Sequence, residues 1–118
     1  MSREIFQEKV KRNGGYIFSE GTHDYEALLA KAYDFLCDFS IRTELRKEIG
    51  KALGVPEGKS AELLHFYNDL PDSDIEVLSS LWNERVFYFL ENLSPHGYYF
   101  GTQEGDGSCF GWFKVEEF

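Results

Sequence analysis

The sequence predicts an α+β fold in which four to five helices pack against a C-terminal antiparallel β-hairpin. Two observations support this class. Between residues 24 and 93, apolar side chains recur at three- and four-residue steps, and after residue 97 the period becomes two. The chain has 118 residues, of which 42% are hydrophobic and 17% aromatic, so it can bury one core. We therefore expect a single compact domain over residues 1–118.

The first half of the chain predicts three helices and one ambiguous segment. A helix from Ser2 to about Arg12 is expected to stop at residues 13–15, Asn-Gly-Gly, a sequence typical of a left-handed helix end. Segment 16–18 is either a third strand or an extended arm laid on the core. An amphipathic helix is expected from residue 22 or 24 to residue 39. Its apolar stripe is Tyr25, Leu28, Leu29, Ala32, Leu36 and Phe39. A basic helix follows from Thr43 to Gly54, because Pro56 prevents its continuation.

Two further helices are expected before residue 95. Ser60 is predicted to cap a short helix that Pro71 closes. The longest helix is expected from residue 72 or 73 to about residue 93. Its apolar stripe is Ile75, Leu78, Leu81, Trp82, Val86, Phe89, Leu90 and Leu93. Phe87 projects about 120° from this stripe, so it either packs beneath the hairpin or belongs to an interface with another molecule.

The C-terminal segment predicts the hairpin. Residues 98–103 and 108–115 flank the turn sequence Glu-Gly-Asp-Gly at 104–107. A four-residue loop would place Phe100 opposite Gly111 and Phe110 opposite Gly101, so that a ring covers each glycine. Aromatic residues occupy both faces of this ribbon, and we therefore expect a second neighbour besides the helices.

No catalytic or metal-binding motif is present. The histidines and cysteines have none of the spacings typical of metal or thiol sites, so we expect no metal and no cofactor. They are His23, His65, His96, Cys37 and Cys109. Both cysteines are expected to be structural, with Cys109 in an exposed hairpin. The acidic loop at 102–108 lacks the ligand spacing of a calcium loop and the lysine of a phosphate loop, which favours a plain turn.

The charge distribution is the main functional signal. The chain has 12 basic and 21 acidic residues, a net charge of -9, which disfavours direct nucleic-acid binding. It has neither a signal-peptide pattern nor an apolar run long enough for a membrane, and we expect a cytoplasmic protein. Eleven acidic and two basic residues lie in the segment 61–118. The acids around Pro71 either cap the next helix or present a negative knob to a basic partner.

Two hypotheses of function follow from these patterns. The first is a small acidic interaction module that docks a basic protein, in one version an inhibitor or immunity-type protein whose carboxylates stand in for phosphates. Its interaction residues would be Asp69, Asp72, Asp74, Glu76, Phe87, Glu104 and Asp106. The alternative is a small-ligand-binding domain or small enzyme with a cleft between the hairpin and the helices. Its binding residues would include His96, Tyr98 and Trp112. A homodimer built by exposed aromatic residues is a third possibility, and the sequence identifies neither partner nor ligand.

Overall fold

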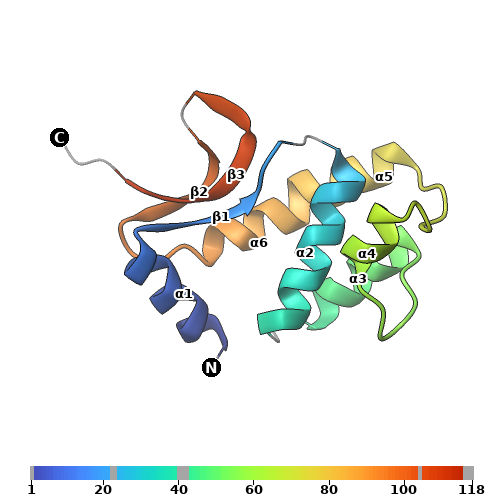
Figure 1. Ribbon diagram of the computed structural model, residues 1–118, viewed down its shortest axis with the longest axis horizontal. Coiled ribbons are helices and arrows are strands. Elements are labelled where there is room, and N and C mark those ends of the chain that lie inside the picture. The colour runs from blue at the N-terminus through green and yellow to red at the C-terminus, as the bar shows by residue number, and fades with distance from the viewer. Residues whose placement is uncertain (1, 22–23, 40–42, 104, 116–118) are drawn as a thin grey trace.

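The chain folds around its second helix, which stands between a sheet at one end of the molecule and short helices at the other (Figure 1). The computed structural model describes residues 2–21, 24–39, 43–103 and 105–115. The helices are α1 (Ser2–Asn13), α2 (Tyr25–Phe39), α3 (Thr43–Leu53), α4 (Ala61–Phe66), α5 (Ile75–Ser80), the π-helical η1 (Leu81–Val86) and α6 (Phe87–Asn92). The strands are β1 (Gly15–Ser19), β2 (Tyr98–Gln103) and β3 (Asp106–Lys114). The α+β prediction is confirmed.

Local capping sets most of the helix boundaries. Asp24 accepts a hydrogen bond from the backbone N–H of Glu26 at the start of α2, at 3.0 Å. Ser60 accepts one from the N–H of Leu63 at the start of α4. Gly54 ends α3 with a φ of 78°, a left-handed conformation that favours glycine. Gly54 and Ser60 lie where the sequence predicts a helix end and a cap, because each acts on residues within one turn.

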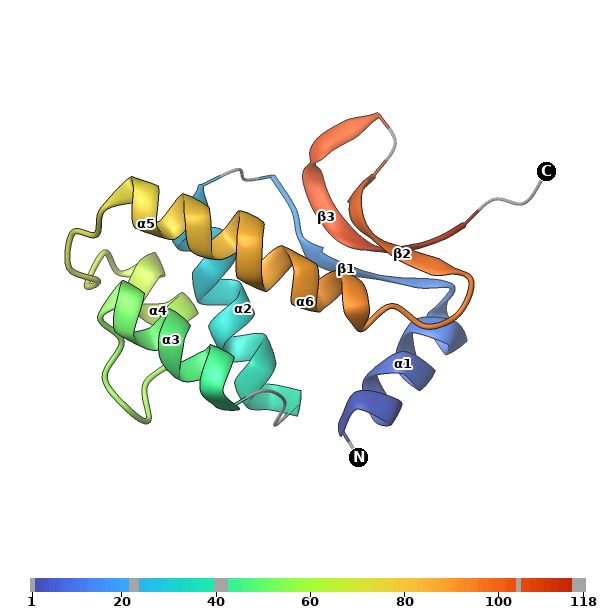
Figure 2. The same ribbon diagram turned by 180° about the vertical axis from the view of Figure 1, so that it is seen from behind.

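The longest helix consists of α5, η1 and α6 in continuous succession (Figure 2). Its buried positions Leu78, Trp82, Val86 and Leu90 follow at four-residue steps. In a regular α-helix, residues four positions apart differ in direction by about 40° around the helix axis, so over several such steps they would no longer lie on one face. The wider π turn takes up this difference. The prediction that Ile75 belongs to the buried stripe is wrong, because Ile75, the first residue of α5, is 66% exposed.

The sheet has the order β1-β3-β2, with both pairings antiparallel. Segment 16–18 is therefore a strand, one of the two alternatives left open by the sequence. The predicted hairpin register is wrong by one residue, since Phe100 faces Trp112 and Gly101 faces Gly111. The pairing shifts between residues 102 and 103, and Gln103 pairs with Asp106 across a loop of two residues rather than four.

Gly111 serves the contact between β1 and β3 and is not covered by an aromatic ring from β2. A Cβ atom at this position would lie 2.5 Å from the backbone oxygen of Tyr16. That distance is far below van der Waals contact, so a side chain here would push β1 away from β3. A glycine is needed here because the backbone of β1 approaches β3 closely. The hairpin predicted from the sequence has only two strands and therefore does not include this contact.

The core is centred on Trp112, which has no exposed surface. Its ring packs edge-on against Phe6 of α1 at 4.6 Å between centroids and stacks on Phe35 of α2 at 5.6 Å. Its indole N–H donates to the backbone oxygen of Leu90 in α6 at 3.0 Å. One ring thus joins the inner face of the sheet to three helices. The buried residues of both ends of the molecule form one contiguous cluster.

Candidate protein-docking surface

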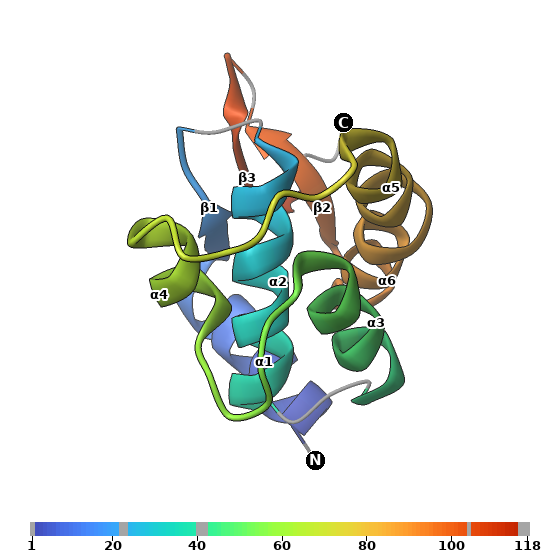
Figure 3. The same cartoon turned by 90° about the vertical axis from the view of Figure 1, so that its right-hand side faces the viewer.

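The helical end of the molecule is formed by α4, the segment 67–74 and α5, and we call it the α4–α5 end. Figure 3 looks directly at it, with α4 on one side of α2, α5 on the other and the connecting segment crossing in front. The principal axis of the molecule measures 46 Å, and the sheet lies toward its other end (Figure 1). Four of the predicted interaction residues belong to this end: Asp69, Asp72, Asp74 and Glu76.

All four carboxylate residues are exposed. Asp74 caps α5 and accepts a hydrogen bond from the N–H of Glu76 at 2.9 Å, so the cap lies one or two residues after the predicted start at residue 72 or 73. Within the described residues, the side chains of Asp69, Asp72 and Glu76 form no hydrogen bond or ion pair. Residues 66–84 contain five carboxylates and no lysine or arginine. The α4–α5 end therefore carries negative charge that the chain itself leaves uncompensated.

Large apolar side chains are exposed among these carboxylates. Phe66 is 77% exposed and Tyr67 67%, and their rings meet edge-on with centroids 5.1 Å apart. Three more apolar residues on the same two helices are at least half exposed, namely Leu63, Ile75 and Val77. Exposed apolar residues scattered singly are normal, but such a concentration at one end is typical of interaction surfaces. The sequence analysis did not assign any of these five residues to a site.

Polar contacts explain how α4 stays in place with its apolar side chains outside. Asp34 of α2 accepts hydrogen bonds from the Ser60 hydroxyl at 2.6 Å and from the N–H groups of Ala61 and Glu62. These bonds satisfy donors that the first turn of a helix leaves without an intrahelical partner. Nδ1 of His65 lies 2.6 Å from Oε1 of Glu26. Ala61 is the one fully buried residue of this helix, so α4 is attached largely through its polar groups.

A groove runs between α3 and the α5–η1 segment beside this surface, with a cavity of about 480 Å³. Its apolar lining consists of Ala52, Val77 and Leu81, and its acidic lining of Glu48, Asp74, Glu76 and Glu84. Arg85 is the one cation that lines it, and the Arg85 guanidinium is already paired with Glu48 at 3.0 Å. The groove thus continues the mixture of apolar and acidic groups found on α4 and α5.

Other polar groups join the α5–η1 segment to α2. The Asn83 amide donates to the Tyr25 hydroxyl at 3.5 Å, and hydrogen bonds from Ser79 and Asn83 lower the pKa of Tyr25. Further along α2, burial raises the pKa of Tyr33, and the nearby Cys37 adds to this effect. These contacts fix the relative positions of the helices that build the α4–α5 end.

The remaining predicted interaction residues lie elsewhere. Phe87 is half-buried and packs edge-on against Phe100 at 5.1 Å and Trp82 at 6.1 Å, so it lies under the hairpin. Glu104 lies outside the described residues. Asp106 begins β3, and its backbone pairs with Gln103 near the hairpin tip. The tip projects away from α4 and α5 (Figure 1). The structure therefore does not bring Phe87 or the start of β3 together with the acids around Pro71.

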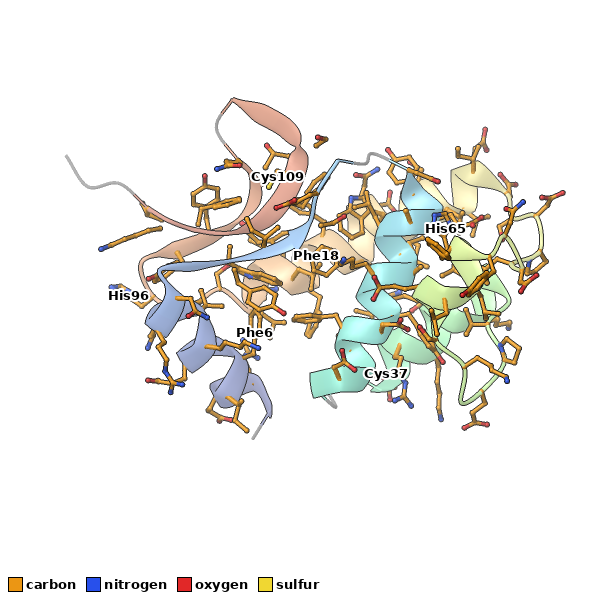
Figure 4. All side chains as sticks on the ribbon, in the orientation of Figure 1. Phe6, Phe18, Cys37, His65, His96 and Cys109 are labelled. Atoms are coloured by element: carbon orange, nitrogen blue, oxygen red, sulfur yellow. The ribbon has the colours of Figure 1, made fainter. Side chains whose placement is uncertain are left out.

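The residues of the alternative ligand-binding hypothesis do not converge on a cleft. His96 is exposed in the turn after α6, and Tyr98 is half-buried. Trp112 is fully buried with its N–H already bonded, and it offers no surface to a ligand. Figure 4 shows His96 at the far end of the molecule from His65. The expectation that Trp112 lines a cleft is wrong, because α1, α2 and α6 close over the inner face of the sheet.

The two cysteines are free thiols in separate places (Figure 4). Cys37 is half-buried, and Nη1 of Arg46 lies 3.9 Å from its sulfur. Cys109 is 3% exposed, so the expectation of an exposed thiol in the hairpin is wrong. Within the part of the chain that the structure describes, no three His, Cys, Asp or Glu side chains are grouped as metal ligands would be. No described helix is long and apolar enough to cross a bilayer.

Comparisons of the chain with models of known protein families, with curated protein sequences and with solved structures find no match.

Proposed function

We propose that this protein is a small acidic interaction module of the cytoplasm that docks a basic protein partner on its α4–α5 end. The observation that carries the proposal is the mixture of exposed apolar side chains and unpaired carboxylates on one surface. Phe66 and Tyr67 would anchor the partner by burying their rings, as aromatic residues do at the centre of interfaces. Asp69, Asp72 and Glu76 would orient the partner and select positive charge. The free thiols fit a reducing compartment.

The character of this surface indicates what kind of basic partner it suits. A surface that imitates nucleic acid needs carboxylates placed at regular intervals, like phosphates. Large apolar groups among the carboxylates do not contribute to such an imitation. Here the two most exposed aromatic rings among the described residues lie next to the acids. We therefore favour a partner that presents apolar and cationic side chains together over a purely cationic cleft, and the inhibitor version of the hypothesis is retained only in that form. The ligand-binding alternative has no comparable support.

The test begins with peptide selection on the purified protein. A displayed library of random peptides is selected at low salt, and the enriched peptides are synthesised and titrated. We expect enrichment of peptides that combine Lys or Arg with aromatic or aliphatic residues. Phe66→Ser combined with Tyr67→Ser should weaken their binding at least tenfold. Asp69→Asn combined with Asp72→Asn should weaken it about two- to tenfold and reduce its dependence on salt.

Matched controls separate a local effect from a general one. Tyr88 on α6 is 66% exposed, nearly the same exposed fraction as the 67% of Tyr67. Tyr88→Ser should therefore leave the affinity for the peptides unchanged. Glu91→Gln on α6 removes an exposed carboxylate outside the α4–α5 end and should also have no effect. Enrichment of peptides without basic residues would contradict the proposal. So would equal binding by the Phe66/Tyr67 variant and the Tyr88 variant.

A further inference from the structure

β1 has one edge that no strand occupies in the described part of the chain. The order β1-β3-β2 leaves β1 at the outside of the sheet, paired only with β3. Its five residues, Gly15–Ser19, include no charged residue and no proline; Gly15, Tyr16 and Ile17 are at least partly exposed, whereas Phe18 and Ser19 are buried. Proteins usually protect such an edge with charges or proline, because its free N–H and C=O groups pair readily with another strand. In Figure 3, β2 lies on the side of α6, whereas β1 lies on the side of α4.

A cavity of about 420 Å³ follows this edge. It is lined by five consecutive residues, Tyr16 to Glu20. Neighbouring side chains of a strand point to opposite faces of the sheet, so a cavity that touches every residue in turn lies along the edge rather than over a face. Since β3 occupies the other edge of β1, the cavity adjoins the unpaired one.

The facing wall of the cavity comes from α2 and α4. Lys31, Phe35 and Asp38 occupy one side of α2 at helical spacing and line the cavity, together with Glu62 of α4. Phe35 is 7% exposed and forms part of the core, so the wall is fixed in position. An open strand edge facing a helix across a groove is the arrangement that receives an extended peptide as an additional strand.

The charges of the groove indicate which peptide it favours. Lys31 is paired with Glu62 at 3.4 Å, so these two charges largely compensate each other. Glu20 and Asp38 are exposed and form no hydrogen bond or ion pair through their side chains among the described residues. The groove therefore has two carboxylates available for a cation, while its backbone edge supplies hydrogen bonds that do not depend on sequence.

We propose that the edge of β1 binds an extended peptide segment carrying a lysine or arginine, which adds to the sheet as a fourth strand. The segment spans about five residues, the length of β1, at roughly 3.3 Å per residue. Its backbone bonds to β1, and its cationic side chain lies between Glu20 and Asp38. This site shares α4 with the α4–α5 end through Glu62, but it uses none of the residues proposed to bind a partner there, and the inference does not depend on the proposed function.

The experiment uses the complete chain and the blocked peptide acetyl-Val-Thr-Arg-Val-Thr-amide, titrated by ¹⁵N–¹H NMR. We expect saturable shifts in residues 16–20 and slower hydrogen exchange at the outward amides of β1. Two forms of the peptide, N-methylated at alternate residues, remove the N–H donors from one edge or the other. One form should bind at least tenfold more weakly than the parent, and the other should bind similarly.

Variants of the protein test the charge assignment. Glu20→Gln and Asp38→Asn should each weaken binding about two- to fivefold. The Asp69→Asn/Asp72→Asn variant should bind the peptide like the wild type, which separates this site from the α4–α5 end. Replacing the peptide's arginine with glutamate should abolish the shifts.

Several results would overturn the inference. The first is equal binding by both N-methylated forms of the peptide. The second is a set of shifts confined to residues outside β1 and α2, and the third is equal binding by the arginine peptide and the glutamate peptide. Protection of the β1 amides that rises with protein concentration before peptide is added would also overturn it, because a second copy of the chain would then occupy the edge.

Discussion

The sheet end and the α4–α5 end differ in how far their aromatic side chains are exposed. At the sheet end, Phe18, Phe100 and Trp112 are at most 3% exposed, and their rings pack on one another. At the α4–α5 end, Phe66 and Tyr67 are mostly exposed and touch mainly each other. The first region is held by apolar burial, and α4 is held largely by hydrogen bonds that its first turn and Ser60 donate to Asp34 of α2. The comparison shows that an apolar residue can remain exposed when polar contacts attach its helix to the rest of the molecule.

The largest expected difference between the two ends is in stability. Trp112→Ala removes a fully buried ring and leaves the Leu90 oxygen without its donor, and it should lower the free energy of unfolding by about 3–5 kcal/mol. Phe66→Ala removes a ring that is mostly in water and should change it by about 0.5 kcal/mol or less. Urea denaturation followed by circular dichroism measures both. Similar losses in the two variants would show that Phe66 belongs to the core.

Within the sheet end, the two facing glycines provide a matched pair. Gly111→Ala should cost about 1–3 kcal/mol, because its methyl group would collide with the backbone of β1. Gly101→Ala meets only the Tyr99 ring, at 3.5 Å, and should be neutral or stabilise the strand by about 0.5 kcal/mol. Thermal or urea unfolding of both variants decides between them. A neutral Gly111→Ala would mean that β1 is not closely paired with β3.

The polar attachment of α4 predicts an intermediate effect. Asp34→Ala removes the acceptor of three hydrogen bonds at the start of α4 and should cost about 1–2 kcal/mol. The amides of Ala61 and Glu62 should also exchange faster with solvent. Asp38→Ala, one turn further along α2, removes an exposed carboxylate and should change stability by about 0.5 kcal/mol or less. Unchanged exchange at Ala61 in the Asp34 variant would argue that apolar contacts hold α4.

The smallest effect at neutral pH concerns Tyr33, beneath the α2–α3 contact. Its pKa is raised above its ordinary value of 10.0, chiefly by burial, so the native state keeps a proton that the unfolded chain loses. The stability associated with this proton is complete below pH 10 and is lost as the pH rises through the native pKa. Tyr33→Phe should therefore lose less stability than the wild type above pH 10. Parallel stability curves for the two proteins from pH 9 to pH 11.5 would contradict this assignment.

Local rules in the sequence predicted the helices and some of their ends. Gly54 and Ser60 have the predicted roles, whereas α4 ends at Phe66, before Pro71, and the next helix starts at Ile75 rather than at residue 72 or 73. The acidic character of the segment around Pro71 could also be predicted, because residues that are neighbours in sequence share one surface there. The exposure of Phe66 and Tyr67 on the same surface could not be predicted, because these residue types are usually found in a core. The start of α4 is attached to another helix by Asp34, which lies 27 residues before Ala61, and this long-range contact was not predicted.

By itself, then, the sequence determined the α+β class, the helices and the two strands of the hairpin, because periodicity and capping are short-range properties. Only the tertiary structure decided that segment 16–18 is a strand paired with β3, and it also decided the one-residue shift of the hairpin and the burial of Cys109. The π turn within the long helix and the exposure of Ile75 were likewise decided only in the folded molecule. Side-chain exposure depends on which elements meet, and those meetings join residues far apart in the chain.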